Sequence, residues 1–594
     1  MISVHRLPET AFAALAAGEG SPAVIRGLQE AQRSKHLMLL HALAQAAGVL
    51  DGPSDGQEPA AFQAGYELLA RIRAADPATG NWLLGLPHLG GWLHDGLLHL
   101  DRGTVPDLAY LACLTASAAV RAGLSFEIDA PVRAGRVQLP GLGCIMLGDD
   151  DRTRWVRLCS DGDLLTTRGG GRRLELAGHT LTPDYEPVRP VSRWRGTPGV
   201  RVLADGLGWD VLLETEDRYL DRYPLPMDAL REGALQRWRH RVQSTWQLLV
   251  RHHRWLAEPM AAGVSVIVPL ASSSENVLIS ATSPAAFGAV ATSWPPDTAT
   301  MAETLIHEFQ HVKLGGLMDM VPLTDSHGEK AYAPWREDPR PADGLLQGIY
   351  AHLGIARYWA AQRHAETDPD DILRAQGQFA RWRSAIDVAL PALRETGCLT
   401  PYGARFAGLL ADRARELMGE QVPAGAASLA AEAALDHRLT WEFRHLATDP
   451  AEVARLADAY LRGEPRPEQG AAAVQVQENA RKTGSDVRSR LLTMRYLAPA
   501  RYRELRADVG LGLSSADRLL LTEADEEAVE AYRAQIAACS DAQPDAWIGL
   551  ALALHRLSSS PPREALARRL ALVCDVHSRL GGGCDPLDLA GWLA

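Results

Sequence analysis

The stretch TMAETLIHEFQHVKL, residues 300–314, decides how this chain is organised, because it contains an H-E-x-x-H motif. An α-helix completes a turn in about 3.6 residues, so His307 and His311 stand one above the other on the same face. Two imidazoles on one face can bind a single divalent metal ion. Thr300 and Glu303 have the spacing of a capping box, which predicts a helix that is capped by Thr300 and carries the motif.

Length and composition set the outer limits. A chain of 594 residues is too long for one hydrophobic core and indicates several domains. The net charge is −12 and no Lys/Arg-rich run occurs, so neither nucleic acid nor an anionic membrane is an expected partner. The seven cysteines never form C-x-x-C, which favours reduced thiols. Because we find neither a signal-peptide pattern nor a long apolar stretch, we expect a soluble, cytoplasmic protein.

The hydrophobic periodicity on either side of the motif predicts the fold class. Helical spacing prevails before residue 126, and short strand-like runs separated by Gly- and Asp-bearing turns follow. Two further strands are expected at Val264–Leu270 and Asn276–Ser280, directly before the motif helix. The prediction is a mainly α protein with a smaller β-rich module, of the α+β class. Its H-E-x-x-H metal site lies on a central helix beside a short β-sheet.

Changes in this periodicity suggest four domains. They are a helical amino-terminal region (1–125), a β-rich module (126–216), a metal-binding catalytic domain (217–462) and a helical carboxy-terminal domain (463–594). The last boundary is the Gly- and Pro-containing segment 463–470. Helical hairpins are expected after it, and a tetratricopeptide-like array is one interpretation of them.

A metal site of this kind needs a third protein ligand. The pattern H-E-x-x-H-x-x-G-x-x-H fails, because Leu317 occupies the place of its last histidine. Most downstream candidates lie in a turn-rich stretch where solvated side chains are expected. His352 differs, because it lies in an apolar helical segment, 344–356, that could pack against the motif helix. We predict His352 as the third ligand; the alternative is a hydrogen-bonded core histidine. The full set of candidates is Asp319, Asp325, His327, Glu337, Asp338, Asp343, His352 and His364.

The segment 332–341 places two arginines and two aromatic residues between the predicted ligand helices. A guanidinium group binds a carboxylate through two parallel N–H bonds, as recognition of a dicarboxylic cosubstrate requires. Arg336 and Arg340 are therefore candidates for cosubstrate binding. The alternative is a surface loop in which they pair with Glu337 and Asp338. Two or three imidazoles suit Fe²⁺ as well as Zn²⁺, so spacing leaves the metal open.

Residues 307–314, 332–341 and 344–354 resemble the HExxH-motif domain of actinobacterial gene clusters for ribosomally made, post-translationally modified peptides. Residues 5–8 and 31–37 are similar to the amino-terminal part of stand-alone members. The resemblance implies an iron(II)- and 2-oxoglutarate-dependent peptide β-hydroxylase, with a precursor peptide and O₂ as its other substrates.

On this resemblance, His307 and His311 bind the metal and His352 completes the site. Arg336 or Arg340, with Tyr332 nearby, would bind 2-oxoglutarate. Glu308 is the remaining candidate for the catalytic machinery, and it would orient a metal ligand or a metal-bound water.

Two other classes of function stay open. In a zinc metallopeptidase that processes a peptide, Glu308 would deprotonate a metal-bound water. In a binding scaffold, the metal site would be vestigial. An essential Glu or Asp, together with a tyrosine or histidine placed to stabilise an oxyanion, favours the peptidase. An arginine directed into the metal's own cavity favours the oxygenase.

Overall fold

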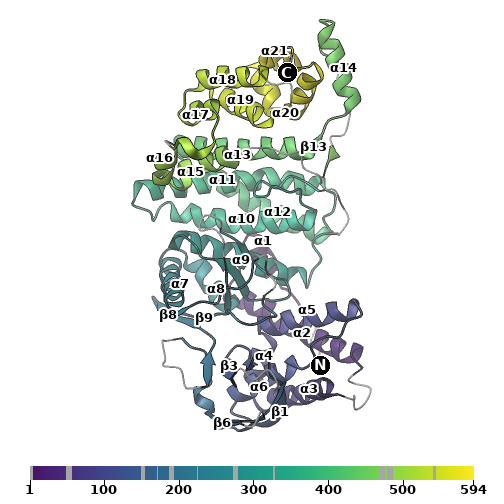
Figure 1. Cartoon of the computed structure of the whole chain (residues 1–594), viewed down its shortest axis with the longest axis vertical. Coiled ribbons are helices and arrows are strands. Elements are labelled where there is room, and N and C mark those ends of the chain that lie inside the picture. Colours follow the sequence, from purple (N-terminus) through teal and green to yellow (C-terminus); the bar gives the residue numbers. More distant parts are fainter. Residues whose placement is uncertain are drawn as a thin grey trace. The chain divides into compact units, whose positions relative to one another are not determined.

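The computed structural model divides the chain into two compact units, residues 1–322 and 323–594. Helices dominate both units, and most of the strands belong to unit 1 (Figure 1). This confirms the predicted mainly α fold with a smaller β-rich part. The division between the units falls inside the predicted catalytic domain, 217–462. The structure describes residues 5–48, 56–148, 154–169, 172–185, 193–221, 223, 225–271, 278–325, 328, 330–467, 475–477, 486–506, 508–538 and 543–594.

Unit 1 begins with helices, and all but the first of them contribute apolar side chains to one core that also includes the strands that follow. Several of these helices begin with proline at the first helical position, where a missing N–H costs nothing. The helices are α1 (Glu9–Ala16), α2 (Pro22–Ala46), α3 (Gln57–Ala75), α4 (Pro77–Leu84), α5 (Pro87–Asp101) and α6 (Tyr110–Arg121).

Two small antiparallel sheets follow, within the predicted β-rich module. The first has the order β1-β4-β5-β6, and the second has the order β2-β3-β7. Residues alternate between buried and less buried along β2 and through most of β1, as expected of strands with one covered face. The strands are β1 (Ser125–Pro131), β2 (Arg136–Leu139), β3 (Gly143–Met146), β4 (Trp155–Asp161), β5 (Leu164–Gly169), β6 (Arg172–Ala177) and β7 (Trp194–Gly196).

A five-stranded mixed sheet, of order β11-β12-β10-β9-β8, lies beside the motif helix. Its central strands β10 (Val266–Leu270) and β12 (Ala289–Ser293) are parallel, and every residue in them is buried. The edge strand β11 (Ser280–Ala281) runs antiparallel to β12. The sheet is completed by β8 (Gly199–Ala204) and β9 (Leu207–Leu213), and α7 (Glu232–His252) and α8 (Arg254–Gly263) connect β9 to β10.

The two strands predicted before the motif correspond to β10 and β11. Strand β10 begins at Val266, two residues later than expected. Strand β11 overlaps the second prediction only at Ser280, and residues 276–277 of that prediction lie outside the described residues.

The motif helix α9 (Thr298–Met318) begins earlier than the sequence predicts. Its amino-terminal cap is Asp297, whose carboxylate accepts a hydrogen bond from the backbone N–H of Thr300 at 2.7 Å. The predicted cap at Thr300 is therefore wrong. Aspartate is a better cap than threonine, and Pro296 ends the preceding loop immediately before it.

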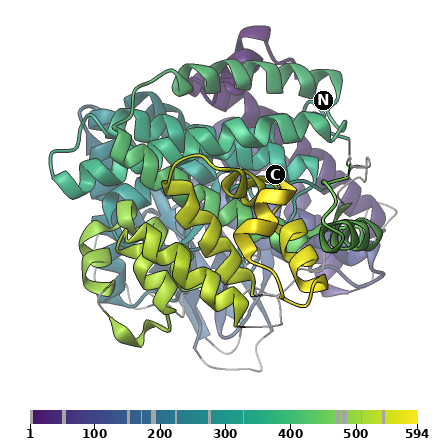
Figure 2. The ribbon, with the colours of Figure 1, turned by 90° about the horizontal axis from the view of Figure 1, so that it is seen from above.

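Unit 2 is built almost wholly of helices that pack against their sequence neighbours. Figure 2 shows the last of them, α20 and α21, side by side in yellow. The tetratricopeptide interpretation stays a prediction. The helices are α10 (Ala342–Gln362), α11 (Pro369–Glu395), α12 (Pro401–Met418), α13 (Ala424–His445), α14 (Pro450–Leu461), α15 (Asp486–Leu497), α16 (Pro499–Leu505), α17 (Ser515–Leu521), α18 (Asp525–Ala537), α19 (Pro544–Arg556), α20 (Pro561–Arg579) and α21 (Pro586–Leu593), with short strands β13 (Leu446–Ala447) and β14 (Gln475–Val476).

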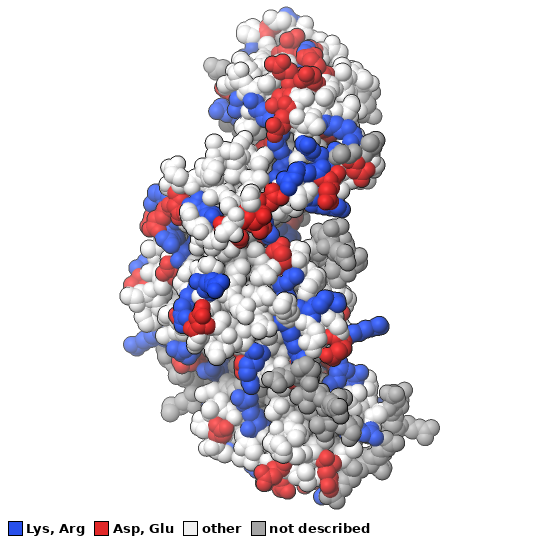
Figure 3. Space-filling view, turned by 90° about the vertical axis from the view of Figure 1, so that its left-hand side faces the viewer, with Lys and Arg blue, Asp and Glu red and all other residues white. Residues whose placement is uncertain are grey.

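Charges of both signs are interspersed on the face that Figure 3 shows. This mixture agrees with the modest net charge of −12. Within the described ranges, no helix combines the length and the apolarity that crossing a bilayer requires.

Candidate metal centre

Helix α9 is buried on every side but one. Between Met301 and Met318, the residues that are not buried include Glu303, His307, His311 and Gly315, each four positions after the last. This spacing places them along one stripe of the helix. A Cβ atom on Gly315 would meet nothing within 4 Å, so the stripe faces open space just beyond His311. The helix therefore presents the two motif histidines and buries nearly everything else.

The two histidines converge as ligands of one metal ion would. Their Nε2 atoms are 3.1 Å apart, and their rings are inclined at 78°. With metal–nitrogen bonds of about 2.05 Å, this separation corresponds to an N–metal–N angle of about 98°, between the tetrahedral and octahedral values. The donor pair therefore fits a divalent first-row metal and does not select among such metals.

Glu308 lies beside this pair and is held from a second element. Its side chain is 2% exposed, and one carboxylate oxygen, Oε1, is 4.0 Å from Nε2 of His307. The other oxygen, Oε2, accepts a hydrogen bond of 2.5 Å from the hydroxyl of Thr282. Thr282 directly follows the edge strand β11, so the sheet fixes the orientation of the carboxylate. A charge-assisted bond of this kind is stronger than a bond between neutral groups.

Tyr223 adds a second buried hydroxyl near Glu308. Burial, and to a smaller extent the charge of Glu308, raises the pKa of Tyr223 above its usual value. The hydroxyl therefore keeps its proton at neutral pH. Its oxygen is shielded from solvent and has no hydrogen-bond partner among the described residues. A neutral tyrosine beside the motif glutamate is the kind of donor that can stabilise an oxyanion.

Lys313 fixes the position of α9 within unit 1. Its side chain is 1% exposed, yet its ammonium group is satisfied, because it donates to the carbonyls of Gly18 and Glu19 at 3.0 Å each. These carbonyls follow the carboxyl end of α1, where a positive charge is favourable. The ammonium group also lies 5.3 Å from the centre of the Phe309 ring.

His352, the predicted third ligand, belongs to α10 in unit 2. Its ring packs against both Trp335 and Trp382, whose ring centres are each 4.5 Å from its own, and its side chain is buried. Nδ1 donates to the carbonyl of Gly348 at 2.8 Å. In a neutral ring this bond makes Nε2 the nitrogen with the lone pair, which is the state that a metal ligand requires. Its role as a ligand stays a prediction.

The loop predicted to bind a cosubstrate is a closed hairpin, because Ala331 and Arg340 exchange two backbone hydrogen bonds. Arg336 and Arg340 both pair with Asp338, at 2.9 and 3.2 Å. The sequence left two possibilities for these arginines, binding a cosubstrate and pairing with a neighbouring acid, and the structure shows the second kind of contact. Glu337 instead pairs with Arg444. The role of the two arginines toward a cosubstrate stays a prediction.

Tyr332, from the same loop, does not join these arginines. Its hydroxyl is 2.8 Å from Nδ1 of His437, and its ring packs on Trp441. Trp335 is the loop residue that reaches His352. A Cβ atom on Gly348 would stand 2.4 Å from the Trp335 ring, so this close packing requires glycine.

The remaining candidates for a third ligand are dispersed. Asp319 is paired with Lys35 at 2.8 Å, His364 is exposed, and His327 lies outside the described residues. Among the described residues, no group of three or more His, Cys, Asp or Glu side chains is gathered closely enough to hold a metal ion.

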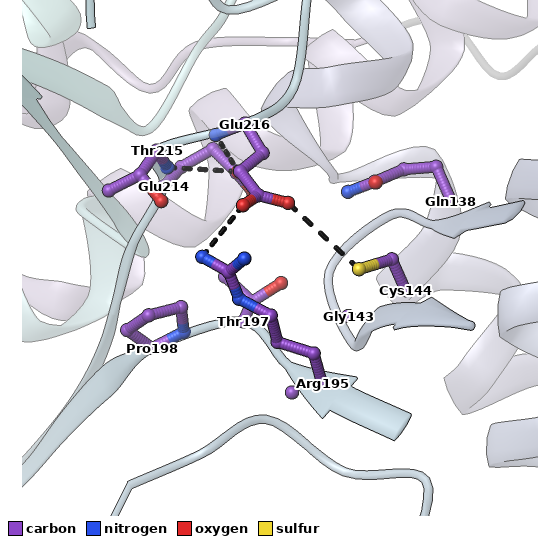
Figure 4. A pocket seen from close by; sticks show the side chains of 10 residues that line it. Gln138, Gly143, Cys144, Arg195, Thr197, Pro198, Glu214, Thr215 and Glu216 are labelled. Atoms are coloured by element: carbon purple, nitrogen blue, oxygen red, sulfur yellow. Dashed lines mark hydrogen bonds and ion pairs between the residues drawn. The ribbon is translucent and has the colours of Figure 1, made fainter. Parts of the chain in front are cut away.

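A small polar pocket in unit 1 contains Glu216 between Arg195 and Cys144 (Figure 4). Arg195 binds one carboxylate oxygen of Glu216, Oε1, at 2.7 Å, and Arg136 binds the other, Oε2, at 3.0 Å. The pocket encloses only about 10 Å³, which is room for roughly one water molecule. We assign it a structural role, because these ion pairs connect β2 and β7 to the loop after β9.

No profile of a known protein family matches the chain, and no curated protein matches it. The structure adds two residues that the sequence did not single out, Thr282 and Tyr223. Neither belongs to a recognisable motif, and both are far from Glu308 along the chain. Only the pairing of β11 with β12 and the packing of α9 on this sheet bring Thr282 to the motif.

Proposed function

We propose that the protein is an iron(II)- and 2-oxoglutarate-dependent hydroxylase that installs a β-hydroxyl group on a side chain of a ribosomally made precursor peptide. The observation that carries the metal-dependent part of this proposal is the 3.1 Å approach of the His307 and His311 Nε2 atoms on the one open stripe of α9. The resemblance of residues 307–354 to peptide-modifying HExxH proteins supports the choice of reaction.

His307 and His311 would hold the metal, and His352 is the proposed third ligand. Iron with 2-oxoglutarate and O₂ supplies the oxidation of a C–H bond. Glu308, fixed by Thr282, would orient a water molecule beside the metal, because its Oε1 is 4.0 Å from the Nε2 atom of His307 that would bind the metal. Arg336 or Arg340, with Tyr332, is proposed to bind 2-oxoglutarate, and this requires an arginine to exchange Asp338 for the cosubstrate carboxylate.

A peptide substrate is supported by the position of β11. This strand is the edge of its sheet, and an extended peptide can pair with such an edge through main-chain hydrogen bonds. Thr282 directly follows β11 and bonds to Glu308. A peptide bound along this edge would therefore pass close to the motif.

A second function, zinc-dependent peptide hydrolysis, is favoured by Tyr223. In that reaction Glu308 would take a proton from a water molecule, and the protonated hydroxyl of Tyr223 would donate to the oxyanion formed from the peptide carbonyl. The buried hydroxyl near Glu308 and the position of Oε1 both suit these roles.

One experiment separates the two reactions. The full chain is loaded anaerobically with Fe²⁺, mixed with 2-oxoglutarate and the precursor peptide encoded beside it, and then exposed to air. We expect the peptide to gain the mass of one oxygen atom, and omission of 2-oxoglutarate to abolish the gain. Peptide cleavage with Zn²⁺ and without 2-oxoglutarate would replace the hydroxylase proposal by the peptidase.

The cosubstrate residues are tested separately. Arg336→Ala and Arg340→Ala should leave Fe²⁺ affinity unchanged, and at least one of them should weaken 2-oxoglutarate binding by about tenfold or more, the effect of losing one charge-assisted contact. Arg415→Ala, on an exposed stretch of α12, is the control. If both loop variants bind 2-oxoglutarate as the unmodified chain does, neither arginine holds it.

A further inference from the structure

Unit 2 contains a cavity of about 420 Å³, a volume typical of small-molecule sites. Small apolar side chains of α11 and α13, including Ala380, Ala385, Ala430 and Ala434, form one part of its wall. The polar part combines Tyr332 with side chains from the same two helices and from α19. The cavity therefore joins an apolar surface to a group of hydrogen-bond donors.

The cavity wall contains arginine, histidine and tyrosine side chains and no acidic side chain among its described residues. Arg381, Arg383, Arg438 and His555 line the cavity, and none of the described residues that line it is Asp or Glu. An anionic ligand would meet no carboxylate there.

The three arginines differ in how they are neutralised. Arg383 donates to the carbonyls of Leu417 and Glu420 at 3.0 and 2.6 Å, so it caps the end of α12. Arg438 pairs with Glu442 at 2.9 Å. Among the described residues, Arg381 has neither a hydrogen bond nor an ion pair, and its nearest partner is the Trp382 ring at 5.4 Å. A half-buried charge without a counter-ion is costly, and a bound anion would remove that cost.

Two histidines near these arginines have lowered pKa values. Burial, with Arg381 and Arg444 acting in the same direction, lowers the pKa of His437 to about 4. Burial, together with nearby arginines that include Arg438, also lowers the pKa of His555. Both rings are therefore neutral at pH 7, and the charge of the cavity comes from arginine.

We propose that this cavity is a binding site for a small carboxylic acid with an apolar body. The carboxylate lies against Arg381, whose planar guanidinium matches it with two parallel N–H bonds, and the apolar body lies against the alanines of α11 and α13. An inorganic anion would leave the alanine surface uncovered, and a neutral apolar molecule would leave Arg381 without a counter-ion. This site is independent of the metal, and Tyr332 is the residue that it shares with the proposed cosubstrate site.

The test is calorimetric titration of the full chain with phenylbutanoate, which has both features. Phenylbutanamide lacks the charge, and acetate lacks the apolar body. We expect phenylbutanoate to bind at one site per chain and each of the others to bind at least about tenfold more weakly. Equal affinity for the acid and the amide, equal affinity for phenylbutanoate and acetate, or no binding of phenylbutanoate at millimolar concentration would each overturn the proposal.

Two variants locate the site. Arg381→Leu removes the charge, and Ala431→Leu narrows the cavity at an exposed position of its wall, so neither disturbs a paired or fully buried group. Each should weaken phenylbutanoate binding by about tenfold or more without changing Fe²⁺ binding. Arg415→Leu, which removes one exposed positive charge elsewhere in unit 2, should bind like the unmodified chain. Unchanged binding in both cavity variants would refute the location.

Discussion

Replacing Thr282 by valine tests whether the sheet really positions the motif glutamate. The change preserves the shape of the side chain and removes the hydroxyl that donates to Oε2 of Glu308 at 2.5 Å. Because Glu308 is 2% exposed, water cannot easily take the place of the lost donor. A hydrogen bond to a charged group contributes about 1.5–3 kcal/mol, and we expect Thr282→Val to lose that amount of stability.

Calorimetry of the metal-free protein measures the loss. For a unit of this size, residues 1–322, the expected loss lowers the unfolding temperature of unit 1 by roughly 2–4 °C. Thr282→Ser retains the hydroxyl and should stay within about 1 kcal/mol of the unmodified chain, apart from the small cost of the missing methyl group. The valine variant should also bind Fe²⁺ more weakly, because Glu308 is no longer held beside His307. Identical unfolding temperatures and metal affinities for the valine and serine variants would refute the reasoning.

Two further predictions concern packing and pH. Gly348→Ala forces Trp335 away from α10 and should destabilise unit 2 by about 1–3 kcal/mol in thermal unfolding, whereas Gly408→Ala, with nothing within 4 Å, should be neutral or stabilising by up to about 1 kcal/mol. Burial lowers the pKa of His36 from 6.5 to about 4, so the folded state holds this ring neutral while the unfolded chain protonates below pH 6.5. The free energy of unfolding is therefore unaffected by this histidine above pH 6.5. It decreases by up to about 3 kcal/mol as the pH falls toward 4. His36→Asn can still donate to the carbonyl of Leu84 and should make the midpoint of urea denaturation less dependent on pH over that range. The same pH dependence in the variant and the unmodified chain would contradict this.

Local patterns predicted the parts of this fold that local physics determines. The spacing of the motif on a helical turn predicted α9, and a mainly apolar run predicted β10, whose residues are all buried. The cap was misplaced, because Asp297 and Thr300 can both accept a backbone N–H and only the three-dimensional structure shows which one does.

The candidate site was predictable only where its residues share one helix. His307 and His311 follow from spacing, whereas Thr282 and Tyr223 come to Glu308 through strand pairing and packing over long sequence separations. Among the arginines, too, the sequence singled out only those that are close together along the chain. Arg336 and Arg340 stood out because they are close in sequence, and both pair with Asp338. Arg381, on a helix without any motif, lines a cavity and has neither a hydrogen bond nor an ion pair among the described residues.

The central claim is that α9 binds a divalent metal through His307 and His311. The most direct measurement is Fe²⁺ binding by the purified full chain under anaerobic conditions, compared with His307→Ala, His311→Ala and His364→Ala. The account predicts one tightly bound ion per chain, lost in both motif variants and retained in the His364 variant, whose side chain is exposed and outside the stripe. Metal bound equally by the motif variants and the unmodified chain would contradict it.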